Sequence, residues 1–151
     1  MRISKDLPLS EITLRRYEKP FDLEGRELIR KFCLSLGLLQ PGDSRDIIVD
    51  ILAVLLIAKK NKEALSSAEV QKRATDYRKE NNLELKGVAP SNIRRQLKKL
   101  KDIFIIECVN NNYRVSEFED LDLIYNKKIE KFFLENIQER VREYFEAVKK
   151  F

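Results

Sequence analysis

The amino-acid sequence predicts a mainly helical fold with one small β-hairpin. Three observations support this prediction. Apolar residues recur at helical spacing through several segments, a glycine and a Pro-Gly turn separate the first two of these segments, and asparagines separate two short apolar runs near residue 111. The chain has 151 residues, of which 43% are hydrophobic. This is enough for one domain with its own core.

Two helices are expected in the first part of the chain. The first spans about 22–36, with Asp22 as its cap, and ends at Gly37, because glycine tolerates the left-handed conformation of a helix end. The second begins at residue 43 or 44 and continues to about 60. It is apolar around most of its circumference, which is typical of a helix at the centre of a core. Residues 12–17 are expected to form a short strand.

Two further helices and the hairpin follow. Ser66 and Glu69 match a capping box, which predicts a helix from there to about Lys79, directly after a short Leu-Ser strand. Pro90 fits the first turn of another helix, which ends near Leu100.

The hairpin has strands at 103–109 and 113–116 around the turn Asn110–Asn112. Residues 119–151 form a long charged helix, either continuous or broken near Asn126.

The excess positive charge is confined to one part of the chain. Residues 59–101 carry thirteen positive and five negative side chains, a net charge of +8, whereas residues 1–58 carry nine of each. A local basic patch on a folded domain indicates a polyanion as partner. A solubilising surface is the plainer interpretation of the same charges.

The order of elements over residues 44–116 resembles the winged helix-turn-helix superfamily, as found in archaeal and bacterial transcription regulators. The segment VAPSNIRRQLKKLKDIFIIECVNNNYRVS carries the resemblance, since Ile93, Leu97 and Leu100 form an apolar helical pattern before a hydrophobic strand. The resemblance implies a DNA-binding winged helix-turn-helix domain over 44–116. Residues 1–43 are then an N-terminal extension with one helix, and residues 117–151 are a C-terminal helical tail.

Two features depart from the superfamily pattern. The connection over residues 80–89 is longer than the usual three or four residues between the second and third helices. The glycine that often precedes the wing is absent, and Asp102-Ile103-Phe104 stands in its place.

The helix at 90–101 is expected to enter the major groove of DNA. Ile93, Leu97 and Leu100 lie within about 60° of one another on a helix and form its buried stripe. Arginine can bind guanine, asparagine can bind adenine, and lysine neutralises phosphate. The resemblance places the hairpin turn near the DNA backbone or the minor groove. The expected DNA-contacting residues are Ser91, Asn92, Arg94, Arg95, Lys98, Lys99, Asn111, Asn112 and Arg114.

The alternative for this helix is a solvated face with no partner. No acidic residue occurs between Ala89 and Lys101, so intrahelical salt bridges are not expected to explain the charges. Four further cations of the preceding helix either extend the positive surface or serve only solubility: Lys72, Arg73, Arg78 and Lys79.

The tail carries an apolar seam with the a/d spacing of a coiled coil. Its members are Leu134, Ile137, Val141, Tyr144, Val148 and Phe151. One hypothesis is that the seam forms a homodimer or docks on a partner helix, since DNA readers often pair so that two recognition helices meet successive turns of the major groove. The competing hypothesis is that the tail folds back over Phe32 and Leu36.

Composition argues against several function classes. The chain has no histidine and two widely separated cysteines, Cys33 and Cys108, which are interpreted as small buried apolar residues. No catalytic constellation, phosphate loop or metal site is predicted, so neither an enzyme nor a cofactor is expected. The N-terminus does not match a signal peptide, and the longest apolar run, Ile51–Ala58, is too short to span a membrane. A cytoplasmic protein is therefore expected.

The sequence leaves three functions open. The first is a DNA-binding protein, and specifically a transcription regulator. The second is a winged helix that contacts other proteins within a larger complex, for which apolar side chains are expected on the helix at 90–101 in place of its arginines and lysines. The third is RNA binding, which favours exposed aromatic residues, whereas the basic segment contains only Tyr77.

Overall fold

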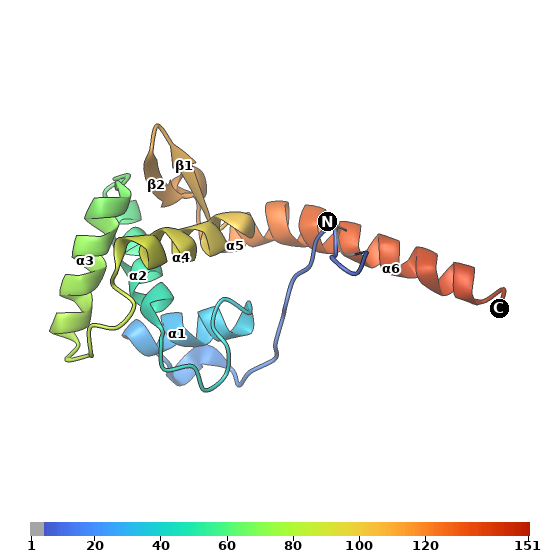
Figure 1. Cartoon of the computed structure of the whole chain (residues 1–151), viewed down its shortest axis with the longest axis horizontal. Helices are drawn as coiled ribbons and strands as arrows, with labels where there is room; N and C mark the ends of the chain where they lie inside the picture. Colours follow the sequence, from blue (N-terminus) through green and yellow to red (C-terminus); the bar gives the residue numbers. More distant parts are fainter. Residues whose placement is uncertain (1–4) are drawn as a thin grey trace.

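The computed structural model describes residues 5–151. It confirms a mainly helical structure with a two-stranded antiparallel hairpin. Helices α1 (Gly25–Ser35), α2 (Ile47–Lys60), α3 (Ser67–Glu80) and α4 (Pro90–Asp102) form the body of the molecule (Figure 1). The hairpin follows α4, and the last helix extends away from the body (Figure 1).

Helix α2 is the central helix of the core. It packs against α1, α3 and α4, and its Ile48, Ile51, Leu52 and Leu55 are buried. The helix begins at Ile47, later than the expected residue 43 or 44. Asp46 occupies its N-cap position, but the carboxylate binds arginines of other helices and caps no backbone N–H.

The N-terminal segment differs from the prediction in two ways. Helix α1 begins at Gly25, because Asp22 belongs to a separate 3-10 turn, η1 (Pro20–Asp22). The prediction of a strand at 12–17 is wrong. This segment is held against the end of α1 by a hydrogen bond from the Arg15 N–H to the Ser35 carbonyl (2.8 Å), and it has no partner strand within residues 5–151.

Helix α3 begins where the capping box predicts. The Ser66 hydroxyl accepts a hydrogen bond from the Glu69 N–H (3.2 Å), and the Glu69 carboxylate accepts one from the Ser66 N–H (3.0 Å). The two bonds satisfy N–H groups that a helix start otherwise leaves without partners.

The hairpin is formed by β1 (Ile106–Val109) and β2 (Asn112–Val115). Asn110 and Asn111 make the turn with φ angles of 51° and 63°. Two consecutive positive φ angles define the type I′ turn that matches the twist of a two-residue hairpin, and asparagine tolerates them. The predicted Leu-Ser strand is present as a single bridge, in which Leu65 and Tyr113 exchange backbone hydrogen bonds of 2.9 and 2.6 Å.

The first strand begins three residues later than predicted because α4 continues to Asp102 and ends in a Schellman motif. The Ile105 N–H donates to the Leu100 carbonyl (3.1 Å) and the Phe104 N–H to the Lys101 carbonyl (3.0 Å). Phe104 takes the left-handed position, with φ at 66°, where a glycine is usual. Its ring packs edge-on against Phe132 and Phe133, with centroids 6.0 and 5.9 Å apart.

The tail is one helical rod from residue 121 to 148. After the short turn η2 (Ser116–Phe118), it consists of α5 (Leu121–Ile124), a π-helical section η3 (Tyr125–Leu134) and α6 (Glu135–Val148). No break occurs near Asn126, because the backbone keeps right-handed helical angles at both junctions.

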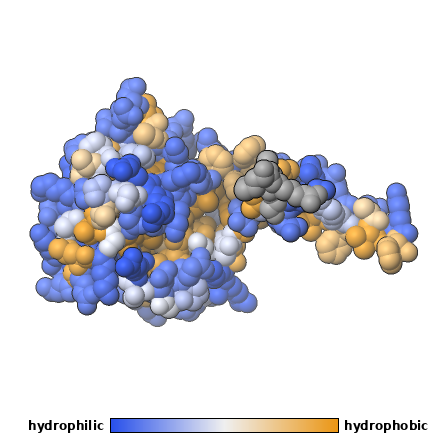
Figure 2. All heavy atoms as spheres, in the orientation of Figure 1, coloured by the Kyte–Doolittle hydropathy of each residue, from blue (hydrophilic) through white to orange (hydrophobic). Residues whose placement is uncertain are grey.

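The two halves of the tail have different environments. Ile129 is buried, and with Tyr125 it lines an open pocket of about 310 Å³ whose opposite wall includes Phe32 and Leu36. The first half of the tail therefore packs against the body, whereas no residue of the 134–151 seam, for which the competing hypothesis expects this contact, is buried. Helix α6 has no buried side chain and projects from the body with hydrophobic residues on its surface (Figure 2). None of the described helices, α6 included, is both long and apolar enough to cross a membrane.

Candidate nucleic-acid interface

Helix α4 has one buried and one exposed face, as predicted. Ile93, Leu97 and Leu100 are fully buried against the core. Proline at the first helical position fits the helix start, since its missing N–H has no partner to lose there. The exposed face carries Ser91, Arg94, Arg95, Lys98, Lys99 and Lys101.

The cations of this face differ in what they contact. The Lys98 ammonium lies 2.9 Å from the Asp102 carboxylate, one turn further along the helix. The expectation that no intrahelical salt bridge forms is therefore wrong, because α4 extends to Asp102. The side chains of Arg94, Lys99 and Lys101 form neither a hydrogen bond nor an ion pair with any other residue in 5–151. Their charges are thus available to an external anion.

Asn92 is already engaged inside the protein. Its amide nitrogen donates to the Gly87 carbonyl (2.8 Å), and its amide oxygen accepts from Arg95 and Gln96 (3.1 Å each). These bonds use both ends of the amide that the sequence assigned to adenine.

The long connection between α3 and α4 is fastened at three points. Besides the bond from Asn92, the Gln71 amide donates to the Val88 carbonyl and the Arg78 guanidinium to the Glu84 carbonyl, both at 2.7 Å. Gly87 has a φ of 77°, and a Cβ there would lie 2.9 Å from the Asn92 amide nitrogen. The connection is longer than usual, yet these bonds fix the position of α4 relative to α3.

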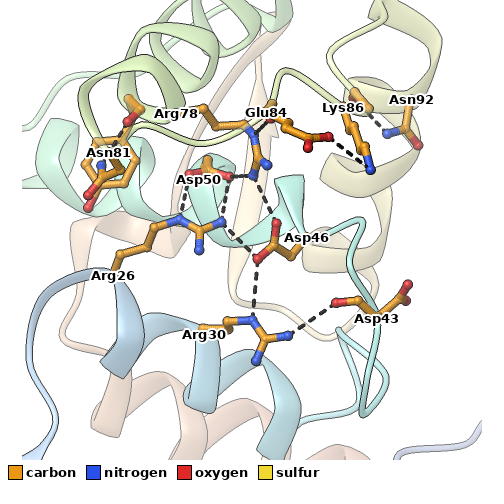
Figure 3. A network of polar contacts seen from close by, with 12 residues as sticks. Arg26, Arg30, Asp43, Asp46, Asp50, Arg78, Asn81, Glu84, Lys86 and Asn92 are labelled. Carbon is orange, nitrogen blue, oxygen red and sulfur yellow. Dashed lines mark hydrogen bonds and ion pairs between the residues drawn. The ribbon is translucent and has the colours of Figure 1, made fainter.

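Arg78 belongs to a buried cluster of arginines and aspartates (Figure 3). Its guanidinium lies 2.7 Å from the Asp50 carboxylate and 3.0 Å from that of Asp46. Arg26 of α1 binds the other side of Asp50, with 2.9 and 3.0 Å hydrogen bonds. Asp50 is fully buried and Arg78 is 3% exposed. The cluster ties α1, α2 and α3 together and, through Glu84, the connection to α4.

The sequence interpretation missed this cluster and misplaced Arg78. Arg78 does not extend the positive surface, since its side chain is buried and bonded to two carboxylates. The feature of the sequence that could have predicted the cluster is Asp50, the single acid within the apolar run of α2. Burial raises the pKa of Asp46, but hydrogen bonds from Arg78 and the charge of Arg26 outweigh it, so the pKa lies below its usual value.

Two of the other cations of α3 are paired with acids. Lys72 lies 3.0 Å from Asp76 on the same helix, and Arg73 makes a two-bond pair with Glu63, both bonds at 2.9 Å. Lys79 is exposed at the far end of α3.

The hairpin lies beside α4. Burial and the neighbouring Cys108 raise the pKa of Tyr113, while the charge of Arg94 opposes the rise. The tip residues Asn110 and Asn111 are exposed and Asn112 is half-buried. Arg114 is partly occupied, since it donates to Glu107 (2.7 Å) and its guanidinium lies 5.0 Å from the centre of the Phe118 ring.

The two cysteines have different environments. Cys33 is fully buried, and burial raises the pKa of its thiol to about 12. Cys108 is exposed on the hairpin, so the expectation that it is buried is wrong. It sits opposite Tyr113, on the same strand face as the buried Ile106 but nearer the tip of the hairpin.

Comparison of the chain with models of known protein families, with curated proteins and with solved structures finds no match. Within residues 5–151, no group of three or more Cys, Asp or Glu side chains is placed to hold a metal ion. The geometry of α4 and the hairpin is therefore the basis for assigning a function.

Proposed function

We propose that this chain is a winged helix-turn-helix protein that binds duplex DNA and acts as a transcription regulator. In this proposal α2, α3 and α4 are the three helices of the domain, and Leu65 is its short first strand. Helix α4 is the recognition helix, and the β1–β2 hairpin is the wing. The element order and the bridge between Leu65 and Tyr113 support this assignment.

The observation that carries the proposal is the set of unpaired cations on the exposed face of α4. Arg94 and Lys99 project from a helix whose opposite face is anchored in the core by Leu97 and its neighbours. One α-helix fits the major groove of B-form DNA, where arginine can bind guanine and lysine can neutralise phosphate. Every side chain of α4 that is exposed is polar or charged, apart from Pro90 at its start.

The contacts within the protein sharpen the assignment of roles. Asn92, Arg95 and Arg114 already have partners, so base contacts are expected from Arg94 first, and from Arg95 when it releases the Asn92 amide. Lys98 can join them by exchanging Asp102 for a phosphate. The hairpin is expected to contact the DNA backbone through the exposed amides of Asn110 and Asn111, because the charge of Arg114 is balanced by Glu107.

The proposal is tested by measuring the affinity for duplex DNA against salt concentration. Arg94→Ala with Lys99→Ala is expected to weaken binding and to make the log–log salt slope less negative by about 1.8, since each neutralised phosphate contributes about 0.9. The free energy of unfolding should change by no more than about 0.5 kcal/mol, because both side chains are exposed.

A matched control removes the same charge elsewhere. Arg16→Ala with Lys19→Ala lies on the exposed segment before α1 and is expected to leave the salt slope unchanged. Equal effects of the two double variants would mean that net charge, and not α4, drives binding. Tighter binding to single-stranded or duplex RNA of the same sequence would replace DNA by RNA as the partner.

The second candidate is a winged helix that contacts another protein within a larger complex. The exposed apolar residues of α6 favour this candidate. The apolar residues that this candidate predicts on the exposed face of α4 are absent, apart from Pro90. Absence of duplex binding at low salt, with the chain folded, would support it over the first.

A further inference from the structure

Helix α6 has an apolar stripe that no other segment within residues 5–151 covers. Val141, Tyr144, Phe145 and Val148 are between 47% and 75% exposed, and no side chain of α6 is buried. In Figure 2 the stripe lies on the end of the helix that extends furthest from the body. Exposed aromatic and aliphatic side chains in a continuous stripe are typical of an interaction surface.

The stripe is narrow and has a charged opposite face. At 100° per residue, Ile137, Val141, Tyr144, Phe145 and Val148 lie within about 100° of one another. The side chains on the other face are charged: Glu139, Arg142, Glu143 and Glu146. An amphipathic helix of this kind packs its stripe against a partner helix and leaves the charges in water.

We infer that the partner is α6 of a second copy of this chain, in antiparallel orientation. The a/d seam is self-complementary in this orientation. A two-fold axis between Val141 and Tyr144 places Val141 opposite Tyr144 of the partner subunit, and Ile137 opposite Val148 of the partner subunit. The half-buried Leu134 then lies opposite Phe151 of the partner subunit. All six seam positions are used, and an isologous dimer requires such reciprocal contacts.

The charges at the two ends of the helix favour the antiparallel pairing. Glu135 lies at its start, whereas Lys149 and Lys150 follow its last turn. The antiparallel arrangement brings the acidic start of each helix to the basic end of its partner, and a parallel one would bring like charges together. The helix of 14 residues is only about 21 Å long, so the dimer should dissociate measurably on dilution.

The link between α6 and the body lets the dimer orient its two α4 helices, and the use of that orientation for DNA binding rests on the proposed function. Phe104 at the end of α4 packs against Phe132 and Phe133 of the rod that continues into α6. The dimer therefore fixes the relative orientation of the two α4 helices, as a protein that reads two half-sites needs.

The inference is tested without DNA, so its failure is distinct from failure of the proposed function. Sedimentation equilibrium of the intact chain should show a monomer–dimer equilibrium. Val141→Glu with Tyr144→Glu should shift the dissociation constant upward by at least tenfold, and circular dichroism should show the body still folded. Glu139→Gln with Glu143→Gln, on the opposite face, is the matched control and should leave the constant unchanged. A monomer at all concentrations for the intact chain would overturn the homodimer.

Disulfide trapping tests the orientation. In a Cys108→Ser background, chains with Ile137→Cys are mixed with chains with Val148→Cys and oxidised gently. The antiparallel dimer predicts the mixed disulfide, because these two positions face each other at a separation that a disulfide can bridge. Disulfides between two copies of the same variant, with little mixed product, would show a parallel dimer and overturn the inferred arrangement.

Discussion

Helices α3 and α4 are neighbours of similar length and both are basic, yet their cations differ in whether they have acidic partners. On α3, Arg78 is buried between two aspartates and Arg73 is paired with Glu63. On α4, Arg94 and Lys99 have no acidic partner within residues 5–151. A run of cations in the sequence is therefore a weaker indicator of a binding face than the absence of acids in reach of those cations.

The ends of the two helices differ in the residue that takes the left-handed position. Both end in a Schellman motif, with a non-glycine residue in the left-handed position. At the end of α3 this residue is Asn82, with φ at 55°, and asparagine tolerates the conformation. At the end of α4 it is Phe104, which tolerates it less well but packs against the tail. The end of α4 thus holds the tail in place, whereas the end of α3 has no comparable aromatic contact.

The largest expected effect concerns the buried cation of α3. Arg78→Met should lower the free energy of unfolding by about 3–5 kcal/mol, because it leaves buried carboxylates without a hydrogen-bonded cation. Arg73→Met on the same helix should cost at most about 1 kcal/mol, since that ion pair is partly exposed. Urea denaturation of the two variants measures both values. Similar losses would show that burial does not separate the two arginines.

A smaller effect is expected at the end of α4. Phe104→Ala should destabilise the protein by about 2 kcal/mol through loss of the half-buried ring contacts. Phe104→Gly loses the same contacts but relieves the left-handed strain, so it should be more stable than the alanine variant by about 1 kcal/mol. Thermal denaturation of both variants checks this order, and an alanine variant at least as stable as the glycine variant would contradict it.

The smallest expected effect is on the affinity for duplex DNA, and it comes from breaking one of two ion pairs of equal spacing. Asp102→Asn frees Lys98 on α4 and should strengthen duplex binding by about two- to fivefold, the size of an exposed ion pair. Asp76→Asn frees Lys72 on α3 in the same i, i+4 geometry and should have no effect on affinity. Titration of labelled duplex at fixed salt measures both. If the α3 variant gains as much as the α4 variant, the positive surface extends across both helices.

Local patterns in the sequence determined much of the fold. The capping box at Ser66 and Glu69, the proline at the start of α4 and the paired asparagines of the hairpin turn each act through neighbouring residues, and the structure has all three. The buried stripe of α4 follows from helical periodicity alone. The same periodicity predicts which face of α4 is exposed, and hence most of the candidate interface.

Only the tertiary structure decided which charged and apolar side chains remain available. Arg78 meets acids that are 28 and 32 residues away in the chain, a separation that no local pattern describes. The same dependence on distant segments holds for the tail. Its first half is covered by the body and its second half is not, although both carry apolar residues at helical spacing. Burial and pairing depend on which segments pack together, and periodicity fixes only the face that each helix offers.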